Sequence, residues 1–276
     1  MATVGEVGHA PAGGLRLGYR RAGSGPALLL LHGAYEDSRI WSRQLEGLAD
    51  EFTVLAWDAP GCGTSDDPPD RFTTADYSRC AVELLAELGF SSAHVLGLSW
   101  GSMLALDLVS RHPEAVDSLV LASAYAGWAG SLPAEEVQRR VAQVLREVEL
   151  PAEAFIPDWL PGLLTDAAPA GAADEVAAIM ADFHPAGMRH AALTMGAADL
   201  RPVLPSIAVP TLLLYGELDT RSPVEVGRAL HAQIPGSQLV VLPGAPHLAM
   251  VEQPAAFDAA VRRFLRTPTP PTPPTR

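Results

Sequence analysis

Cysteine is scarce in this sequence, and its scarcity excludes two kinds of protein. Only Cys62 and Cys80 occur among the 276 residues, and two cysteines cannot build a disulfide framework. Neither lies in a CxxC motif or at a Cys/His spacing typical of a metal site. We interpret both as small hydrophobic residues, and we expect a reducing, cytoplasmic compartment, no metal and no cofactor.

Basic residues and long hydrophobic runs are also in short supply. The chain has 19 Lys and Arg against 32 Asp and Glu, a net charge of −13. This charge disfavours nucleic acid and anionic membrane surfaces, because both would be repelled. The longest aliphatic run, Ala27 to Leu31, is too short to span a bilayer, and Met1 to Pro11 lacks the features of a secretory signal. We expect a small-molecule substrate with an apolar part; the oligomeric state stays open.

Apolar residues are abundant, at 48% of the sequence, and they follow a regular order. Short aliphatic runs, and the alternating pattern of 15–22, predict strands, and segments with helical spacing between them predict helices. This alternation is typical of a mostly parallel sheet covered by helices on both faces. The predicted strands are 15–22, 27–31, 53–57, 93–98, 118–122, 211–215 and 238–242, and the helices between and after them are 40–48, 74–88, 102–111, 223–234 and 255–265.

Residues 125–207 interrupt this alternation, because they contain no convincing strand. An apolar stretch at 155–164 is cut by Pro157 and Pro161. We expect 125–207 to form an all-helical cap over the carboxyl edge of the sheet, where open α/β sheets bind ligands. An accessory packing layer is the alternative. The segments with helical spacing are 135–150, 174–183 and 187–198.

These observations divide the chain into three parts. Residues 1–124 and 208–266 are assigned to an α/β core, and the cap is inserted between two of its strands. Residues 267–276 contain only Thr and Pro before the final Arg, so we expect a disordered tail with a polyproline II tendency.

A Gly97-x-Ser99-x-Gly101 motif lies between the predicted strand 93–98 and the helix that follows it. A serine at such a sharp strand-to-helix turn requires small residues two positions before and after it. Its hydroxyl then projects at a helix N-terminus, where free N–H groups favour developing negative charge. Ser99 is therefore the candidate nucleophile.

A serine nucleophile needs a general base and an acid that orients it. His247 follows the last predicted strand, and Asp219 follows the strand before it, so both belong to the same sheet edge as Ser99. Glu217 is the nearest competitor of Asp219 but lies closer to its strand. The stretch 122–125 after the preceding strand has no carboxylate, which favours Asp219.

An oxyanion hole requires two preorganised N–H donors. The backbone N–H of Trp100, at the start of a helix, is the first candidate. The second is the N–H of Ala34, which follows His32-Gly33 at the end of an early strand. Gly33 permits an unusual backbone conformation there, and we expect His32 to brace the loop rather than to do chemistry.

From Gly14 to Leu265 the chain resembles the α/β-hydrolase superfamily with a helical cap. The resemblance implies a mostly parallel eight-stranded sheet and a triad in the chain order Ser, Asp, His. Ser99 excludes the relatives that use a carboxylate nucleophile. The motifs on which the resemblance rests are His32-Gly33, the segment Asp58 to Ser65, Gly97-x-Ser99-x-Gly101, Gly216-x-x-Asp219 and Gly244-x-x-His247.

The resemblance and the residues together predict a serine esterase or lactonase of the carboxylesterase and enol-lactonase type. The nucleophile turn is similar to that of proline iminopeptidases, so peptide cleavage and C–C bond hydrolysis on the same triad remain alternatives. A further alternative, from a different functional class, is a ligand-binding receptor or a cofactor-free oxygenase on this scaffold. The residues expected to line an apolar pocket, unless they only pack the cap on the core, are Trp128, Phe155, Trp159, Phe183, Met188 and Leu248.

Overall fold

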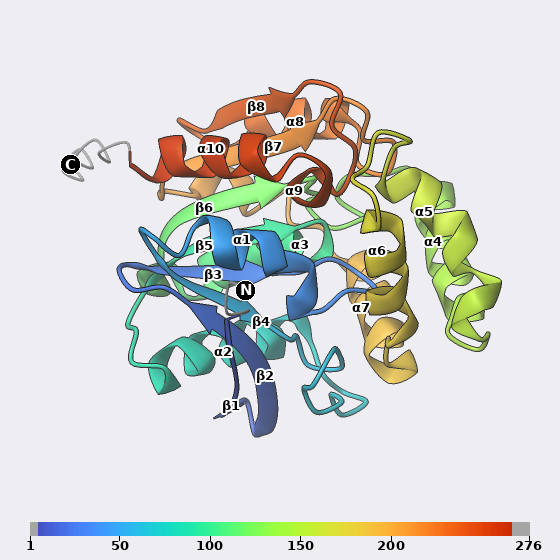
Figure 1. Cartoon of the computed structure of the whole chain (residues 1–276), viewed down its shortest axis with the longest axis horizontal. Coiled ribbons are helices and arrows are strands. Elements are labelled where there is room, and N and C mark those ends of the chain that lie inside the picture. The colour runs from blue at the N-terminus through green and yellow to red at the C-terminus, as the bar shows by residue number, and fades with distance from the viewer. Residues whose placement is uncertain (1–4, 267–276) are drawn as a thin grey trace.

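A computed structural model describes residues 5–266 of the chain. In these residues eight strands form one sheet (Figure 1). The strand order is β1-β2-β4-β3-β5-β6-β7-β8, and all neighbours from β4 to β8 are parallel. The strands are β1 (Glu6–Ala12), β2 (Leu15–Ala22), β3 (Ala27–Leu31), β4 (Thr53–Trp57), β5 (Ala93–Leu98), β6 (Val116–Ala122), β7 (Thr211–Gly216) and β8 (Gln238–Leu242).

Strand β1 is absent from the strands predicted by pattern. It pairs antiparallel with β2 along its whole length, from Glu6–Arg21 to Ala12–Leu15. It lies at the edge of the sheet, and only Ala10 and Ala12 of its residues are buried. A mostly exposed edge strand lacks the continuous apolar run that identified the other strands, apart from 15–22, which was predicted from its alternation. Pro11 is tolerated because an edge strand needs no second set of ladder hydrogen bonds.

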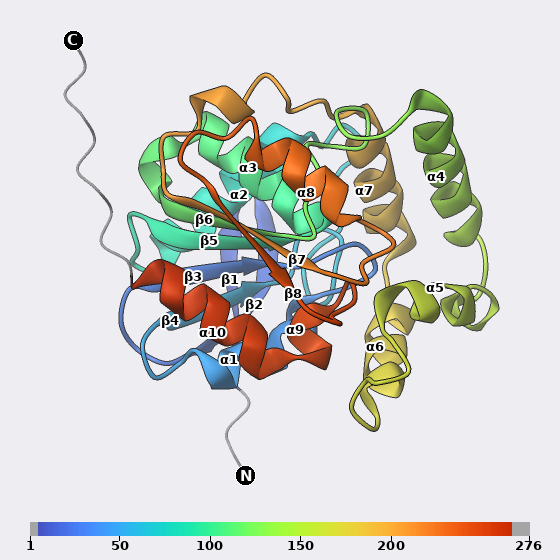
Figure 2. The ribbon, with the colours of Figure 1, turned by 90° about the horizontal axis from the view of Figure 1, so that it is seen from above.

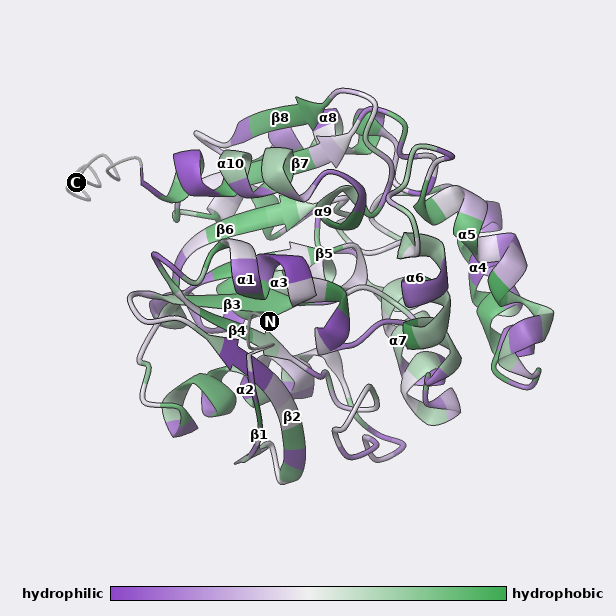
Figure 3. Cartoon of the chain, viewed as in Figure 1, coloured by the Kyte–Doolittle hydropathy of each residue, from purple (hydrophilic) through white to green (hydrophobic). Residues whose placement is uncertain are grey.

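Helices cover both faces of the sheet (Figure 2). Helices α2, α3 and α8 lie on one face, and α1 and α10 lie on the other. Strands β3, β4 and β7 are buried along their whole length, as strands covered on both faces must be. Figure 3 shows that the central strands β3 and β6 are hydrophobic, whereas β2, nearer the edge of the sheet, carries hydrophilic patches. The α-helices outside the segment between β6 and β7 are α1 (Ser42–Gly47), α2 (Thr74–Glu87), α3 (Trp100–Arg111), α8 (Val224–His231), α9 (Ala249–Glu252) and α10 (Pro254–Leu265).

Four α-helices lie between β6 and β7 in the chain, and we call them the insertion. They are grouped at the end of the sheet to which the parallel strands point (Figures 1 and 2). Helix α5 forms where the sequence indicated an interruption: Pro157 occupies the first turn, where its missing N–H has no partner to lose, and Pro161 is accommodated inside. The insertion helices are α4 (Ala134–Glu147), α5 (Ile156–Leu163), α6 (Ala172–Ala181) and α7 (Pro185–Ala197).

The insertion contacts the core through close packing and ion pairs. Gly187 of α7 lies directly against the backbone of Gly61, so that a Cβ on either residue would collide with the other. Arg43 pairs with Glu175 at 2.7 Å, and Arg39 pairs with Asp182 at 2.8 Å. Among residues 5–266, no helix is both long and apolar enough to cross a membrane. The tail predicted at 267–276 lies outside the described residues.

Candidate active site

The turn at Ser99 has the strained backbone that its motif predicts. Ser99 adopts φ 52° and ψ −110° between β5 and α3, a conformation that few non-glycine residues adopt. A Cβ on Gly97 would collide with the Gly101 carbonyl, and a Cβ on Gly101 would collide with the Leu31 carbonyl. The turn therefore tolerates only glycine on both sides, and it presents Ser99 at the start of α3.

His247 and Asp219 are hydrogen-bonded to each other. The distances from the His247 Nδ1 are 2.9 Å to Oδ2 and 3.0 Å to Oδ1 of Asp219. Both side chains are buried. With Nδ1 donating to the carboxylate, Nε2 is the nitrogen that remains available as a base.

Asp219 is held as an anion by its surroundings. Its Oδ1 also accepts the backbone N–H groups of Arg221 at 2.9 Å and Ser222 at 2.8 Å. Burial alone would raise the pKa of Asp219, but His247 and Ser222 outweigh it and lower the pKa below its usual value. Glu217, the competitor considered from the sequence, instead accepts the Gly244 N–H at 2.8 Å in an exposed position.

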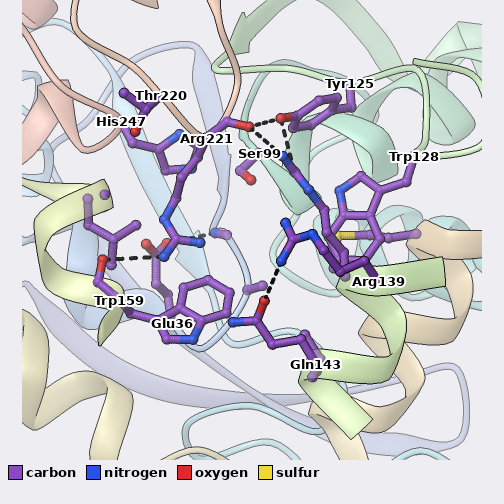
Figure 4. A pocket seen from close by; sticks show the side chains of 17 residues that line it. Glu36, Ser99, Tyr125, Trp128, Arg139, Gln143, Trp159, Thr220, Arg221 and His247 are labelled. Carbon is purple, nitrogen blue, oxygen red and sulfur yellow. Dashed lines mark hydrogen bonds between the residues drawn. The ribbon is translucent and has the colours of Figure 1, made fainter. Parts of the chain in front are cut away.

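Ser99 and His247 line the same pocket (Figure 4). Within residues 5–266, no hydrogen bond joins the Ser99 hydroxyl to the imidazole. Such contacts between a nucleophile and its base are often long in a ligand-free site and tighten when substrate binds.

The loop after β3 holds Ala34 between two anchored residues. The Gly33 N–H donates to the Glu36 carboxyl at 2.8 Å, and the Tyr35 N–H donates to the Met188 sulfur at 3.1 Å. Within the described part of the chain, the N–H of Ala34 has no acceptor, and Ala34 lines the pocket. Trp100 is the first residue of α3, where N–H groups lack intrahelical acceptors. Both N–H groups are therefore candidates to hold an oxyanion.

His32 braces this loop from behind. Its Nε2 accepts the Ala59 N–H at 3.1 Å, so its Nδ1 carries the proton and donates to the Gly33 carbonyl at 2.8 Å. Burial lowers the pKa of His32, which keeps the imidazole neutral. His32 therefore links the loops after β3 and β4.

The pocket beside Ser99 has a volume of about 280 Å³, enough for a small ligand. The core loops contribute one part of its wall, and helices of the insertion contribute the other (Figure 4). The residues that line it are Gly33, Ala34, Glu36, Ser99, Tyr125, Trp128, Arg139, Arg140, Gln143, Val144, Trp159, Gly162, Leu163, Met195, Thr220, Arg221 and His247.

Two of the aromatic residues expected in the pocket, Trp128 and Trp159, line it. Phe155 and Phe183 are not among the lining residues; their rings pack on Tyr35 at centroid distances of 5.1 and 5.3 Å. Met188 accepts the Tyr35 N–H on the far side of the loop, and Leu248 is fully buried. Phe155, Phe183 and Met188 therefore pack the insertion against Tyr35 of the core, and none of the four residues lines the cavity.

The charged residues of the pocket were not predicted from the sequence. Arg140 lies three residues after Val137 and four before Val144, so it interrupts the apolar stripe of α4; that position was a usable signal. Arg221 follows Asp219 by two residues on the same sheet edge. The direction in which the Arg221 and Glu36 side chains point could not be inferred from their spacing in the sequence.

Within residues 5–266, no cluster of three or more His, Cys, Asp or Glu side chains could hold a metal ion.

Comparisons with known proteins agree with this architecture. The family described as alpha/beta hydrolase fold matches residues 26–187, and the family described as TAP-like protein matches residues 190–276. A hydrolase from Pseudomonas aeruginosa is similar with 31% identity and a TM-score of 0.86, covering 96% of this chain and 100% of that one.

Two further solved structures have named activities. An esterase from Thermogutta terrifontis is 28% identical with a TM-score of 0.84 and covers 95% of this chain and 98% of that one. An enol-lactonase from Burkholderia xenovorans is 26% identical with a TM-score of 0.85 and covers 94% of this chain and 100% of that one.

Proposed function

This chain belongs to the α/β-hydrolase family, and we propose that it is a serine hydrolase that cleaves a carboxylic ester or a lactone. The observation that carries the proposal is the buried hydrogen bond between His247 and Asp219 beside a pocket that Ser99 also lines. The named esterase and enol-lactonase structures are similar to this chain over almost their whole lengths, which favours this bond type.

The mechanism follows from these positions. The His247 Nε2 takes the proton of the Ser99 hydroxyl as its oxygen attacks the ester carbonyl. Asp219 holds the imidazole in the tautomer that leaves Nε2 free and stabilises the imidazolium that forms. His247 then gives the proton to the departing alcohol, which leaves an acyl group on Ser99. A water molecule, deprotonated by His247, releases the acid and restores the serine.

The tetrahedral intermediates carry negative charge on the former carbonyl oxygen. The N–H groups of Ala34, on the loop after β3, and of Trp100, at the start of α3, are proposed to hold this oxyanion. Loss of one such donor typically costs about 3 kcal/mol of transition-state stabilisation. His32 and Glu36 contribute by fixing the Gly33 backbone, and therefore the direction of the neighbouring Ala34 N–H.

The pocket chemistry argues against an aminopeptidase. An enzyme that binds a free amine needs carboxylates facing its substrate, whereas three arginines and one carboxyl group, that of Glu36, line this pocket. Two carboxylates of the insertion, Glu175 and Asp182, pair with Arg43 and Arg39 and do not line the pocket.

Ser99→Ala tests the proposal. The purified variant should lose ester turnover and labelling by a fluorophosphonate probe, and mass spectrometry should find the wild-type acyl group on Ser99. Ser206→Ala, at an exposed position, is the matched control and should keep both. Ester turnover by Ser99→Ala would exclude Ser99 as the nucleophile. A folded wild-type protein that neither reacts with the probe nor cleaves any ester or lactone would point to a receptor or an oxygenase.

A further inference from the structure

The active-site pocket is positively charged inside an acidic protein. The whole chain has a net charge of −13, yet three arginines and a single carboxyl group, that of Glu36, line the pocket. Arg221 lies on one side of the cavity and Arg139 on the opposite side (Figure 4). Charge of one sign concentrated in a concave site favours a ligand of the opposite sign.

Arg221 is the least compensated of these groups. Its guanidinium lies over the Trp159 ring, 3.8 Å from the centroid, and one NH2 group donates to the Trp159 carbonyl at 3.3 Å. Within residues 5–266, Arg221 forms no ion pair, and its Nε is buried without a hydrogen-bond partner. A buried donor without a partner costs free energy, which a ligand acceptor would recover.

The nearby carboxylates of Glu147 and Asp219 favour the charged form of Arg221, but within residues 5–266 neither forms an ion pair with it. Glu147 accepts hydrogen bonds from Tyr35 at 3.0 Å, Gln143 at 2.7 Å and the Trp159 indole at 3.0 Å. Burial raises the pKa of Glu36 to about 8, so this group is mostly protonated at neutral pH. Burial and the neighbouring Arg140 lower the pKa of Arg221 to about 10, which still leaves it charged.

The two arginines of α4 add to this charge. Arg139 and Arg140 both donate to the same carboxylate, Glu136, at 2.7 Å. Arg140 also donates to the Tyr125 hydroxyl at 3.1 Å and to the Arg221 carbonyl at 3.3 Å. Two cations thus share one anion at the pocket wall, and α4 is tied to the loop that positions Arg221.

We propose that the pocket accepts an ester or lactone whose acyl part ends in a carboxylate, and that Arg221 binds this carboxylate. The inference rests on the proposed hydrolase function. A planar guanidinium suits a carboxylate because it donates two parallel hydrogen bonds. Val144, Leu163 and Met195 supply an apolar wall for the hydrocarbon between the two ends.

The test compares matched substrates that differ in charge. Monomethyl and dimethyl esters of succinate, glutarate and adipate present the same chain lengths with and without a terminal carboxylate. The wild-type protein should prefer at least one monomethyl ester in kcat/KM. Arg221→Met keeps an apolar stem over Trp159 and should lower the ratio of monomethyl to dimethyl turnover about 10- to 100-fold.

Two further variants control for folding. Arg228→Gln removes an exposed cation of α8 that pairs with Glu225, and it should leave both activities and their ratio unchanged. Arg221→Lys keeps the charge but not the planar donor pair, so it should give a ratio of monomethyl to dimethyl turnover below that of the wild type but above that of Arg221→Met. It replaces Arg221→Met as the test if that variant is too unstable to assay. Thermal denaturation of each variant establishes that it is folded.

Direct binding separates this inference from the proposed function. Glutarate should bind the Ser99→Ala protein in a calorimetric titration, and the added Arg221→Met change should weaken binding at least 10-fold. Hydrolysis of dimethyl esters without a monomethyl preference would overturn the inference and leave the hydrolase intact. If neither an ester nor a lactone is cleaved, the proposed function fails. Glutarate then decides the inference: Arg221-dependent binding supports it, and absent binding overturns it.

Discussion

The Tyr35 hydroxyl donates a hydrogen bond to the Glu147 carboxylate at 3.0 Å, and this contact joins the loop after β3 to helix α4. Tyr35 follows Ala34 directly and has a positive φ of 61°. Its ring lies 4.9 Å from that of Trp159 on α5. The insertion therefore contacts the residue adjacent to a candidate oxyanion donor, so the position of α4 and the direction of that N–H are physically linked.

Tyr35→Phe should test this link. The change removes one of three donors to a buried carboxylate and should lower the free energy of unfolding by about 1.5–3 kcal/mol. Because Ala34 then loses support, we expect kcat to fall more than KM rises. Tyr19→Phe is the control, since in residues 5–266 the Tyr19 hydroxyl has no hydrogen-bond partner. Equal effects of the two changes on kcat would refute the link.

Asp219→Asn should separate the proposed acid from its neighbour. The amide can donate to His247, which stabilises the wrong tautomer, and kcat should fall about 10⁴-fold with little change in stability. Glu217→Gln keeps an acceptor for the Gly244 N–H and should retain activity within a few-fold. Steady-state kinetics on one ester measure both. A larger loss in Glu217→Gln than in Asp219→Asn would assign the role to Glu217.

The extent to which sequence predicted this fold depends on burial. Strands at 27–31, 53–57 and 93–98 have the predicted bounds, because a strand between two helical layers must be apolar along its length. The less buried strands at 15–22 and 238–242 have the predicted bounds as well. The edge strand Glu6–Ala12 was missed, since most of its side chains face water. Helix α5 was missed because its prolines suggested an interruption, while their positions allow a helix.

Some residues of the candidate site could be predicted from the sequence, and others could not. Ser99, Asp219 and His247 were proposed from sequence because each follows a strand at the same sheet edge, a relationship that topology alone fixes. The directions of Arg221 and Glu36 depend on how the insertion packs, which involves residues distant in sequence and leaves no local pattern. Four apolar residues expected in the pocket pack elsewhere for the same reason: composition distinguishes buried side chains from exposed ones, but not a cavity wall from a packed interface.

Glu36→Gln should change how stability depends on pH. The pKa of Glu36 is raised to about 8 in the folded chain, mainly by burial, against 4.5 for an ordinary glutamate. Between these values the folded chain binds more protons than the unfolded chain, so wild-type stability falls as pH rises, by up to about 1.4 kcal/mol per pH unit. Below pH 4.5 both states are protonated, and this contribution is constant.

Glutamine preserves an acceptor for the Gly33 N–H without a titrating proton. Urea unfolding of both proteins at pH 5.5 and 8.0 measures the effect, since groups common to both cancel in the difference. Glu36→Gln should gain stability relative to wild type at the higher pH. The same stability difference at both pH values would show that Glu36 titrates normally.

Gly187→Ala should loosen the insertion from the core. Alanine favours a helix by up to about 1 kcal/mol over glycine, so on propensity alone the change would stabilise α7. The added Cβ, however, would collide with the Gly61 carbonyl, which is backbone and cannot rotate away. We expect the free energy of unfolding to fall by about 1–3 kcal/mol, with faster proteolysis between α4 and α7. We also expect a lower kcat/KM, because the displaced helix carries Met188 away from the Tyr35 N–H.

Gly196→Ala, on the same helix, is the control. It gains the same helix propensity but meets only a methyl group of Val141, so it should cost less stability. If Gly187→Ala were the more stable of the two, the glycine contact would not be what seats the insertion on the core.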